Sequence, residues 1–275
     1  MTFTSKLSKL RFNLSAAAAL LIVGMASVFV TDAPAEAKAA SGPRATIVLV
    51  HGAFAGSSSW NGVAGRLIAK GYPVIAVANP LRSIKGDAAY VASVVKSIPG
   101  PVVLVGHSYG GAVIGNAADG LANVKALVYV TGFAADIGES PSKLAGQFPG
   151  ATLGPAIAPP VVLADGSKDL YIDQAKFHAQ FAADVSASDA AVMAATQRPV
   201  TESALNENSE AAAWKTIPSW FIYGSLDKNI PAAANAFMAE RAHSRKTIEV
   251  KGASHVVMVS HPDAVAALIE EAAAG

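Results

Sequence analysis

The sequence predicts an α/β fold in which an open, doubly wound, mainly parallel sheet of about six core strands carries a helical insertion. From residue 44 onward, short apolar runs alternate with longer segments that have apolar residues at helical spacing. The apolar runs lack polar alternation, which is typical of parallel strands covered on both faces. One stretch, residues 131–217, breaks this alternation and is too long for a simple crossover between two strands.

The predicted elements follow in order along the chain. We expect strands at 45–50, 73–78, 101–105, 126–130, 220–223 and 247–250. Helical spacing predicts helices at 60–70, 87–97, 109–121, 232–241 and 264–273. Two further short helices, at 173–184 and 187–195, fall inside the long insertion, which we interpret as a lid beside the sheet.

Composition limits the classes of function. The 275 residues are 52% hydrophobic and 15% charged, so one domain with a large apolar core is expected. The 21 basic and 20 acidic residues give a net charge of +1 without a basic run in the body of the chain, which argues against a nucleic-acid partner. The absence of cysteine excludes disulfides, thiolate metal sites and a thiol nucleophile.

The first 39 residues are typical of a secretory signal peptide. Lys6, Lys9 and Arg11 precede the apolar stretch 14–30, and alanines between residues 33 and 39 offer small-x-small cleavage sites. We therefore expect a mature domain at 40–275, secreted or periplasmic, with no stable membrane association after cleavage. An uncleaved membrane anchor is the alternative, because the apolar stretch approaches the length of a spanning helix.

The most specific motif is the sequence GHSYGG at residues 106–111, placed between a predicted strand and a predicted helix. A Gly-x-Ser-x-Gly turn in this context exposes the serine hydroxyl on a strained elbow at the edge of the sheet. Ser108 is therefore the candidate nucleophile. The N–H of Tyr109 lies at the start of the next helix, where negative charge is stabilised, and is a candidate oxyanion donor.

A serine nucleophile needs a histidine base and an acid that orients it. His255 follows the last predicted strand at the carboxyl edge of the sheet and is favoured over His261. Asp227 follows the preceding strand, and the order Ser108, Asp227, His255 matches that of the hydrolase class. Asp136, after the strand at 126–130, is the competing acid.

A second oxyanion donor is expected where the first strand ends in the sequence HGAF, residues 51–54. We assign it to the N–H of Ala53, with that of Phe54 as the alternative. His51 is expected to be structural. Phe54 and Tyr109 flank this position and are candidates for contact with substrate. The large apolar side chains of the insertion are a second set of candidates for contact with substrate, and Trp214 is the one that we assign. They are Leu170, Tyr171, Phe177, Phe181 and Trp214.

Together, the segments 51–54 with Trp60, 106–111, 224–231 and 252–262 resemble the α/β-hydrolase superfamily. They are similar to its small cofactor-free carboxylesterases, the group of plant methyl-ester esterases, hydroxynitrile lyases and bacterial pyrethroid-hydrolase-like esterases. The resemblance runs from about residue 47 to 269. It implies hydrolysis of a small to medium hydrophobic ester, with no metal and no cofactor.

Other chemistries of the superfamily stay open. Hydroxynitrile lyases of this group have a threonine after the first-strand histidine and a lysine after the catalytic histidine, where this chain has Gly52 and Val256. Haloalkane and epoxide chemistry would need an aspartate in place of Ser108. Perhydrolysis uses the same triad, and a non-catalytic ligand-binding protein of this fold is a further alternative.

Overall fold

The computed structural model describes residues 44–275, and its central sheet has six strands in the order β2-β1-β3-β4-β8-β9. All neighbouring pairs are parallel. The first described strand, β1, lies second from one edge; β2 is added on one side of it and the other four strands on the other, which confirms the predicted doubly wound topology. The strands are β1 (Thr46–Val50), β2 (Val74–Val77), β3 (Val102–His107), β4 (Val124–Val130), β8 (Ser219–Gly224) and β9 (Lys246–Val250).

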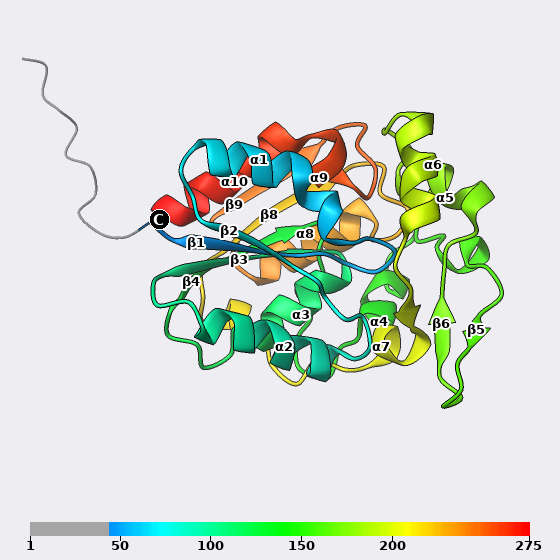
Figure 1. Cartoon of the computed structure of the whole chain (residues 1–275), viewed down its shortest axis with the longest axis horizontal. Coiled ribbons are helices and arrows are strands. Elements are labelled where there is room, and N and C mark those ends of the chain that lie inside the picture. The colour runs from blue at the N-terminus through cyan, green and yellow to red at the C-terminus, as the bar shows by residue number, and fades with distance from the viewer. Residues whose placement is uncertain (1–43) are drawn as a thin grey trace, which may run out of the picture. The chain divides into compact units, whose positions relative to one another are not determined.

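Helices cover both faces of this sheet. Figure 1 shows α1 (Asn61–Ala69) and α10 (Pro262–Ala274) on one face, with α2 (Ile84–Lys96) and α3 (Tyr109–Ala117) on the other. Helix α8 (Ala232–Arg241) packs on β8 and β9. Local signals set several helix starts: Ser83 caps α2 by accepting from the N–H of Gly86, and α10 begins at a proline, which needs no N–H partner there.

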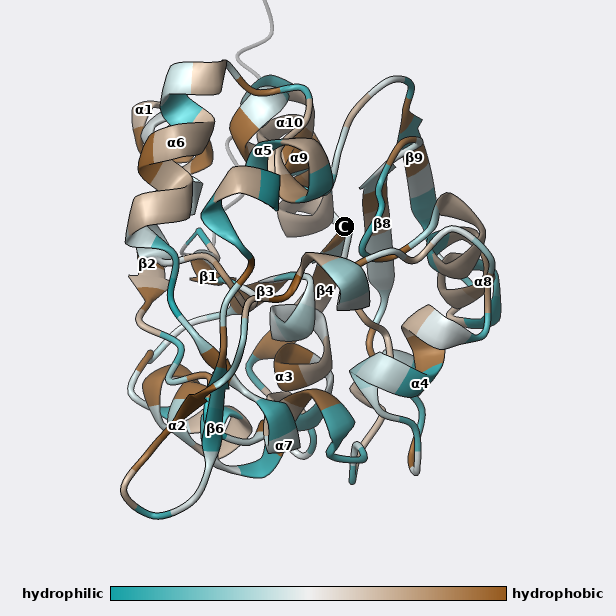
Figure 2. Ribbon diagram, turned by 90° about the vertical axis from the view of Figure 1, so that its right-hand side faces the viewer, coloured by the Kyte–Doolittle hydropathy of each residue, from teal (hydrophilic) through white to brown (hydrophobic). Residues whose placement is uncertain are grey.

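The core is centred on the three middle strands. Every residue of β3 is buried, and four of the five residues of β1 are buried. Helix α3, which shows brown hydrophobic segments in Figure 2, is buried over most of its length against this sheet. Full burial of one Val, Leu or Ile side chain contributes about 1.5–3 kcal/mol, so these strands supply a large share of the apolar burial that stabilises the fold.

The strand register places the candidate site. Val50, the last residue of β1, is opposite Gly106 in β3. On the other side, Val130 in β4 is opposite both His107 and Ile222. The loops that follow β1, β3, β4 and β8 therefore all leave the sheet at the carboxyl ends of its strands, as expected for parallel strands.

The insertion between β4 and β8 contains more structure than the sequence predicted. The predicted helices 173–184 and 187–195 correspond to α5 (Gln174–Phe181) and α6 (Ala187–Thr196). A small antiparallel sheet in the order β5-β6-β7 was not predicted. Figure 1 shows α5, α6, β5 and β6 beyond one end of the central strands. The remaining elements are α4 (Pro141–Gly146), η2 (Gly154–Ala156), β5 (Val161–Val162), β6 (Lys168–Leu170), β7 (Val200–Thr201), α7 (Glu202–Asn206) and η3 (Ala213–Lys215).

The predicted signal peptide at 1–39 lies outside the described residues. Across residues 44–275, no helix combines the length and the apolar character that are needed to cross a bilayer. Two short elements complete the described fold, the 3-10 helix η1 (Ser57–Trp60) and the helix α9 (Val257–Ser260).

Candidate active site

Ser108 stands on a sharp turn between β3 and α3. Its backbone has φ 54° and ψ −124°, a sparsely populated conformation that costs of the order of 1–3 kcal/mol. Close backbone approach makes this turn possible. A Cβ on Gly110 would lie 2.5 Å from the carbonyl oxygen of Val50, and a Cβ on Gly52 would lie 2.6 Å from the Cβ of Ser108. The glycines therefore let the end of β1 reach the serine.

Two backbone N–H groups near Ser108 in the fold were expected to serve as oxyanion donors. Within residues 44–275, neither the N–H of Ala53 nor that of Tyr109 donates to a protein acceptor. The N–H of Phe54, the alternative donor, is taken because it donates to the carbonyl of Arg198 at 3.0 Å. Ala53 also lines a cavity together with Ser108. The local hydrogen bonding thus favours Ala53 over Phe54 as the second donor.

His255 and Asp227 form a buried pair. The Nδ1 of His255 lies 2.7 Å from Oδ2 of Asp227, and the two side chains are 1% and 0% exposed. The other carboxylate oxygen of Asp227 accepts the N–H groups of Asn229 at 2.7 Å and Ile230 at 3.0 Å. In the described part of the chain the Nε2 of His255 has no hydrogen-bond partner. This ring can therefore take a proton at Nε2 while Asp227 holds Nδ1.

Two side chains contact the backbone carbonyl of His255. Neither of them was assigned this role from the sequence. The carbonyl accepts the hydroxyl of Thr131 at 2.8 Å and lies 3.1 Å from Nε2 of His107. Burial, with the neighbouring His255 as a second cause, lowers the pKa of His107 well below 6.5. The neutral His107 ring must then carry its proton on Nε2, because a carbonyl only accepts. No sequence signal marks Thr131 for this role. Asp227 accepts the N–H two residues further on, which is an Asx turn, a common role of an aspartate in a loop.

The competing residues lie elsewhere. Asp136 pairs with Nζ of Lys215 at 2.5 Å and accepts the N–H of Ile137. His261 contacts Oγ of Ser260 at 2.9 Å, and its side chain is 41% exposed. The cavity that contains Ser108 and His255 is lined by neither Asp136 nor His261.

The cavity over Ser108 has a volume of about 360 Å³ and mostly apolar walls. Phe54, Leu170 and Phe181, three of the expected aromatic and aliphatic candidates, line it. The ring of Phe181 also meets that of His255 edge-on, with centroids 5.0 Å apart. The insertion thus provides the apolar roof over the nucleophile. Insertion residues in the wall are Phe133, Pro141, Ser142, Ala145, Gly146, Ala151, Leu153, Gly154, Ile157, Leu170, Phe181, Glu202, Leu205 and Asn206.

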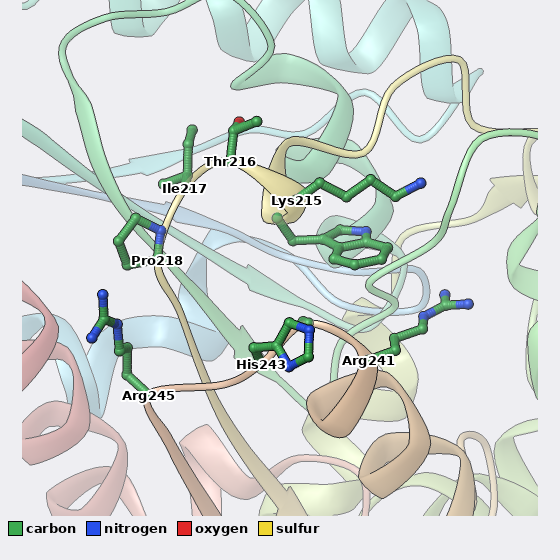
Figure 3. Close-up of a pocket in the computed structure, with 9 residues that line it drawn as sticks. Lys215, Thr216, Ile217, Pro218, Arg241, His243 and Arg245 are labelled. Carbon is green, nitrogen blue, oxygen red and sulfur yellow. The ribbon is translucent and has the colours of Figure 1, made fainter.

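Two expected substrate contacts require correction. The Tyr109 hydroxyl donates to Oδ2 of Asp87 at 2.9 Å in the buried α2–α3 interface, so the Tyr109 side chain is not among the residues that line the cavity. Trp214 lines a separate groove of about 590 Å³ with Arg241 and Arg245, shown in Figure 3. Its Nε1 donates to the carbonyl of Ala135 at 2.9 Å. The residues of this groove directly precede β8 and β9 in the chain. The groove therefore lies at the amino ends of these strands, whereas the candidate site lies at the carboxyl ends.

Comparison with known proteins shows the family of this chain. A model of the "Alpha/beta hydrolase family" matches residues 47–268, most of the chain. The chain belongs to the alpha/beta hydrolase family. It is 28% identical, over 250 residues that cover 82% of this chain and 96% of the relative, to the alpha/beta hydrolase nvfD of Aspergillus novofumigatus.

Solved structures show the same alpha/beta hydrolase fold. Polyneuridine aldehyde esterase matches with a TM-score of 0.72 and 21% identity, covering 83% of this chain and 99% of that one. A pyrethroid hydrolase from Sphingobium faniae JZ-2 matches with a TM-score of 0.65 and 22% identity, covering 84% and 98%. An extracellular alpha/beta-hydrolase from a Paenibacillus species gives 0.66 and 22%, covering 83% and 98%. These TM-scores establish a common fold, as the sequence motifs predicted.

Proposed function

We propose that this alpha/beta hydrolase is a serine esterase that cleaves small to medium hydrophobic carboxylic esters. One observation carries the proposal: His255, which is joined to the buried Asp227 at 2.7 Å, lines the same cavity as the strained Ser108. A base held by a carboxylate beside a serine on a tight turn is the arrangement that activates a hydroxyl for acyl transfer.

The proposed reaction has two halves. The Oγ of Ser108 attacks the ester carbonyl carbon while Nε2 of His255 takes its proton, and the alcohol then leaves with that proton. Water, deprotonated by His255, hydrolyses the acyl-serine and releases the acid. Asp227 keeps the proton on Nδ1 and stabilises the imidazolium that forms in each half.

The N–H groups of Ala53 and Tyr109 would bind the developing oxyanion. Both are free of protein acceptors within residues 44–275 and lie beside Ser108 at the end of β1 and the start of α3. In a measured case, loss of one such donor costs roughly 2.7–4 kcal/mol of transition-state stabilisation. This arrangement needs no metal and no cofactor.

The cavity supports a hydrophobic substrate. Its walls are mainly apolar, and a site of this kind selects by shape and apolar area, with few polar contacts. Polyneuridine aldehyde esterase and the Sphingobium faniae pyrethroid hydrolase share the fold, and their names fit an ester substrate.

The test is a screen of the purified protein against aryl esters with acyl chains of two to twelve carbons, with mandelonitrile beside them. We expect ester hydrolysis and negligible mandelonitrile cleavage. The buried, apolar Val256 follows His255, so no cation is placed there to stabilise cyanide. Comparable rates on both substrate classes would favour a lyase, and no turnover of either would favour a ligand-binding protein.

A further inference from the structure

Phe54 lies where the Ser108 cavity and a second groove adjoin. It is 3% exposed and is the residue that the described linings of the two spaces share. The second groove has a volume of about 380 Å³ and lies between residues 55–62, which follow Phe54, and helix α6 of the insertion. The reaction described above makes no use of this groove.

The groove lies on the side of the base. Val259 lines it and belongs to α9, which begins two residues after His255. The ring of Phe54 meets that of Phe181 edge-on at 6.2 Å, and Phe181 in turn meets His255 at 5.0 Å. Phe54, Phe181 and His255 thus form one continuous row of rings from the groove to the base.

This position matters for the two halves of an ester. The carbonyl oxygen must sit at the N–H groups of Ala53 and Tyr109, whereas the alcohol oxygen must approach Nε2 of His255 to receive its proton when the C–O bond breaks. The alcohol portion therefore starts on the His255 side. The insertion walls of the main cavity, which include Leu153 and Leu170, remain for the acyl chain.

The groove has the chemistry of a site for an alkyl or aryl chain. Val192 is 63% exposed and lines it with Met193 and Val259, while Asn61 and Asp189 are among its polar lining residues. Exposed apolar surface with polar groups around it favours binding of an apolar chain. The far end of such a chain would stay in contact with water.

The backbone of Phe54 is also strained. Its φ of 58° is uncommon for a residue with a large side chain, and its N–H is tied to the carbonyl of Arg198 just after α6. Strain of this kind concentrates at ligand clamps and active sites, where the surrounding structure enforces it. The ring is therefore held in a fixed place between the two spaces.

From these observations we infer that the groove between residues 55–62 and α6 binds the alcohol portion of the ester, and that Phe54 limits how far this portion extends. The inference rests on the proposed esterase function. It assigns the acyl chain to the main cavity and makes Phe54 a residue that determines alcohol specificity.

The experiment compares two ester series with one common member. The alcohol series is methyl, butyl and hexyl butyrate, and the acyl series is methyl butyrate, hexanoate and octanoate, each followed by acid release. The variants are Phe54→Leu, Phe54→Leu with Met193→Trp, which fills the groove, and Phe54→Leu with Ala191→Trp. Ala191 is exposed on the same helix and does not line the groove, so it is the matched control.

We expect Phe54→Leu to raise the ratio of kcat/KM for hexyl over methyl butyrate by at least about fivefold, since one buried methylene is worth up to about fourfold. The acyl-series ratio should change by less than about twofold. Met193→Trp should cancel the gain, whereas Ala191→Trp should preserve it.

Three results would overturn the inference: an unchanged alcohol ratio in Phe54→Leu, a gain confined to the acyl series, or a gain that Met193→Trp does not reduce. Failure of the esterase proposal is distinguishable, because the wild type would then hydrolyse neither series. If Phe54→Leu does not fold, Met193→Trp and Ala191→Trp in the wild-type background replace it. A lower hexyl to methyl ratio in Met193→Trp alone then supports the inference, and equal ratios contradict it.

Discussion

At the level of single residues, two aspartates show how hydrogen bonding separates a catalytic candidate from a surface charge. Asp227 is buried and divides its two oxygens between His255 and the N–H groups of its own turn. Asp136 is partly exposed and uses its carboxylate to pair with Lys215. Only Asp227 can fix the tautomer of the proposed base.

Exchange of each aspartate for asparagine tests this difference. Asp227→Asn should lower kcat by about 10⁴, as in the measured serine protease case, because the amide leaves His255 in the wrong tautomer. Asp136→Asn is the matched control and should change kcat by less than about tenfold. Steady-state kinetics on one aryl ester, with circular dichroism to check folding, measures both. A crippled Asp136→Asn beside an active Asp227→Asn would move the acid to the loop after β4.

Position in the fold is what residue-scale prediction from sequence could use. Ser108, Asp227 and His255 follow three parallel strands, so they were expected at one edge, and the structure brings Asp227 and His255 together. Trp214 was placed wrongly because size and apolarity alone suggested a substrate contact. Its place shortly before β8 assigns it to the opposite edge of the sheet.

At the level of elements, the site depends on the contact between the end of β1 and the first turn of α3. A Cβ atom on Gly110 would lie only 2.5 Å from the carbonyl oxygen of Val50, which is too close for any side chain. Further along α3, a Cβ on Gly115 would lie 3.6 Å from the Tyr129 hydroxyl, an ordinary contact. The packing of this helix thus requires glycine at position 110 and does not require it at position 115.

Alanine at these two positions should have opposite effects. Gly110→Ala must push β1 away from the elbow, so we expect the free energy of unfolding to fall by about 2 kcal/mol or more, with loss of esterase activity. Gly115→Ala should be neutral or stabilise by up to about 1 kcal/mol, because alanine favours the helix. Urea unfolding of both proteins measures this. Equal stability of the two variants would contradict the packing account.

The central strands and their helices were predictable because each is a long apolar run or a clear helical repeat. The small sheet of the insertion was not, because β5, β6 and β7 have only two or three residues each. Its strands include Lys168 and Asp169, charged residues that periodicity assigns to a loop. Such short strands form because tertiary contacts hold them, which outweighs local propensity.

At the level of the whole molecule, buried neutral histidines link stability to pH. Burial lowers the pKa of His51 from 6.5 to about 4, with the positive Arg198 as a further lowering cause, while the hydrogen bond to Gly52 opposes the shift. Between these two values the unfolded chain binds more protons than the folded one, so the free energy of unfolding decreases as pH falls from about 6.5 to about 4. His51 alone accounts for about 3 kcal/mol of this loss.

Replacement of His51 should therefore flatten the acid limb of the stability curve. His51→Asn keeps a hydrogen-bond donor near the Gly52 carbonyl but removes the titrating imidazole. Between pH 6.5 and 4 the free energy of unfolding of this variant should therefore fall by about 3 kcal/mol less than that of the wild type. His261→Asn, at a 41% exposed side chain, is the control. Unfolding free energies at several pH values measure the slopes. A wild-type slope in His51→Asn would contradict the account.

The predicted export of the protein belongs to this scale too. The basic, apolar and alanine-rich order of residues 1–39 predicts that the mature chain begins between Glu36 and Ala40. N-terminal sequencing of protein recovered outside the cytoplasm checks this. An intact Met1 or Thr2 on membrane-bound protein would favour the retained anchor.

The most direct test of the central claim is covalent labelling of the nucleophile. A fluorophosphonate should modify the wild type at Ser108 alone, located by mass spectrometry of the peptides, and block ester hydrolysis in proportion to labelling. Ser108→Ala should remain folded, take no label and lose nearly all esterase activity. Labelling at another residue, or ester turnover by Ser108→Ala at a rate near that of the wild type, would contradict the assignment.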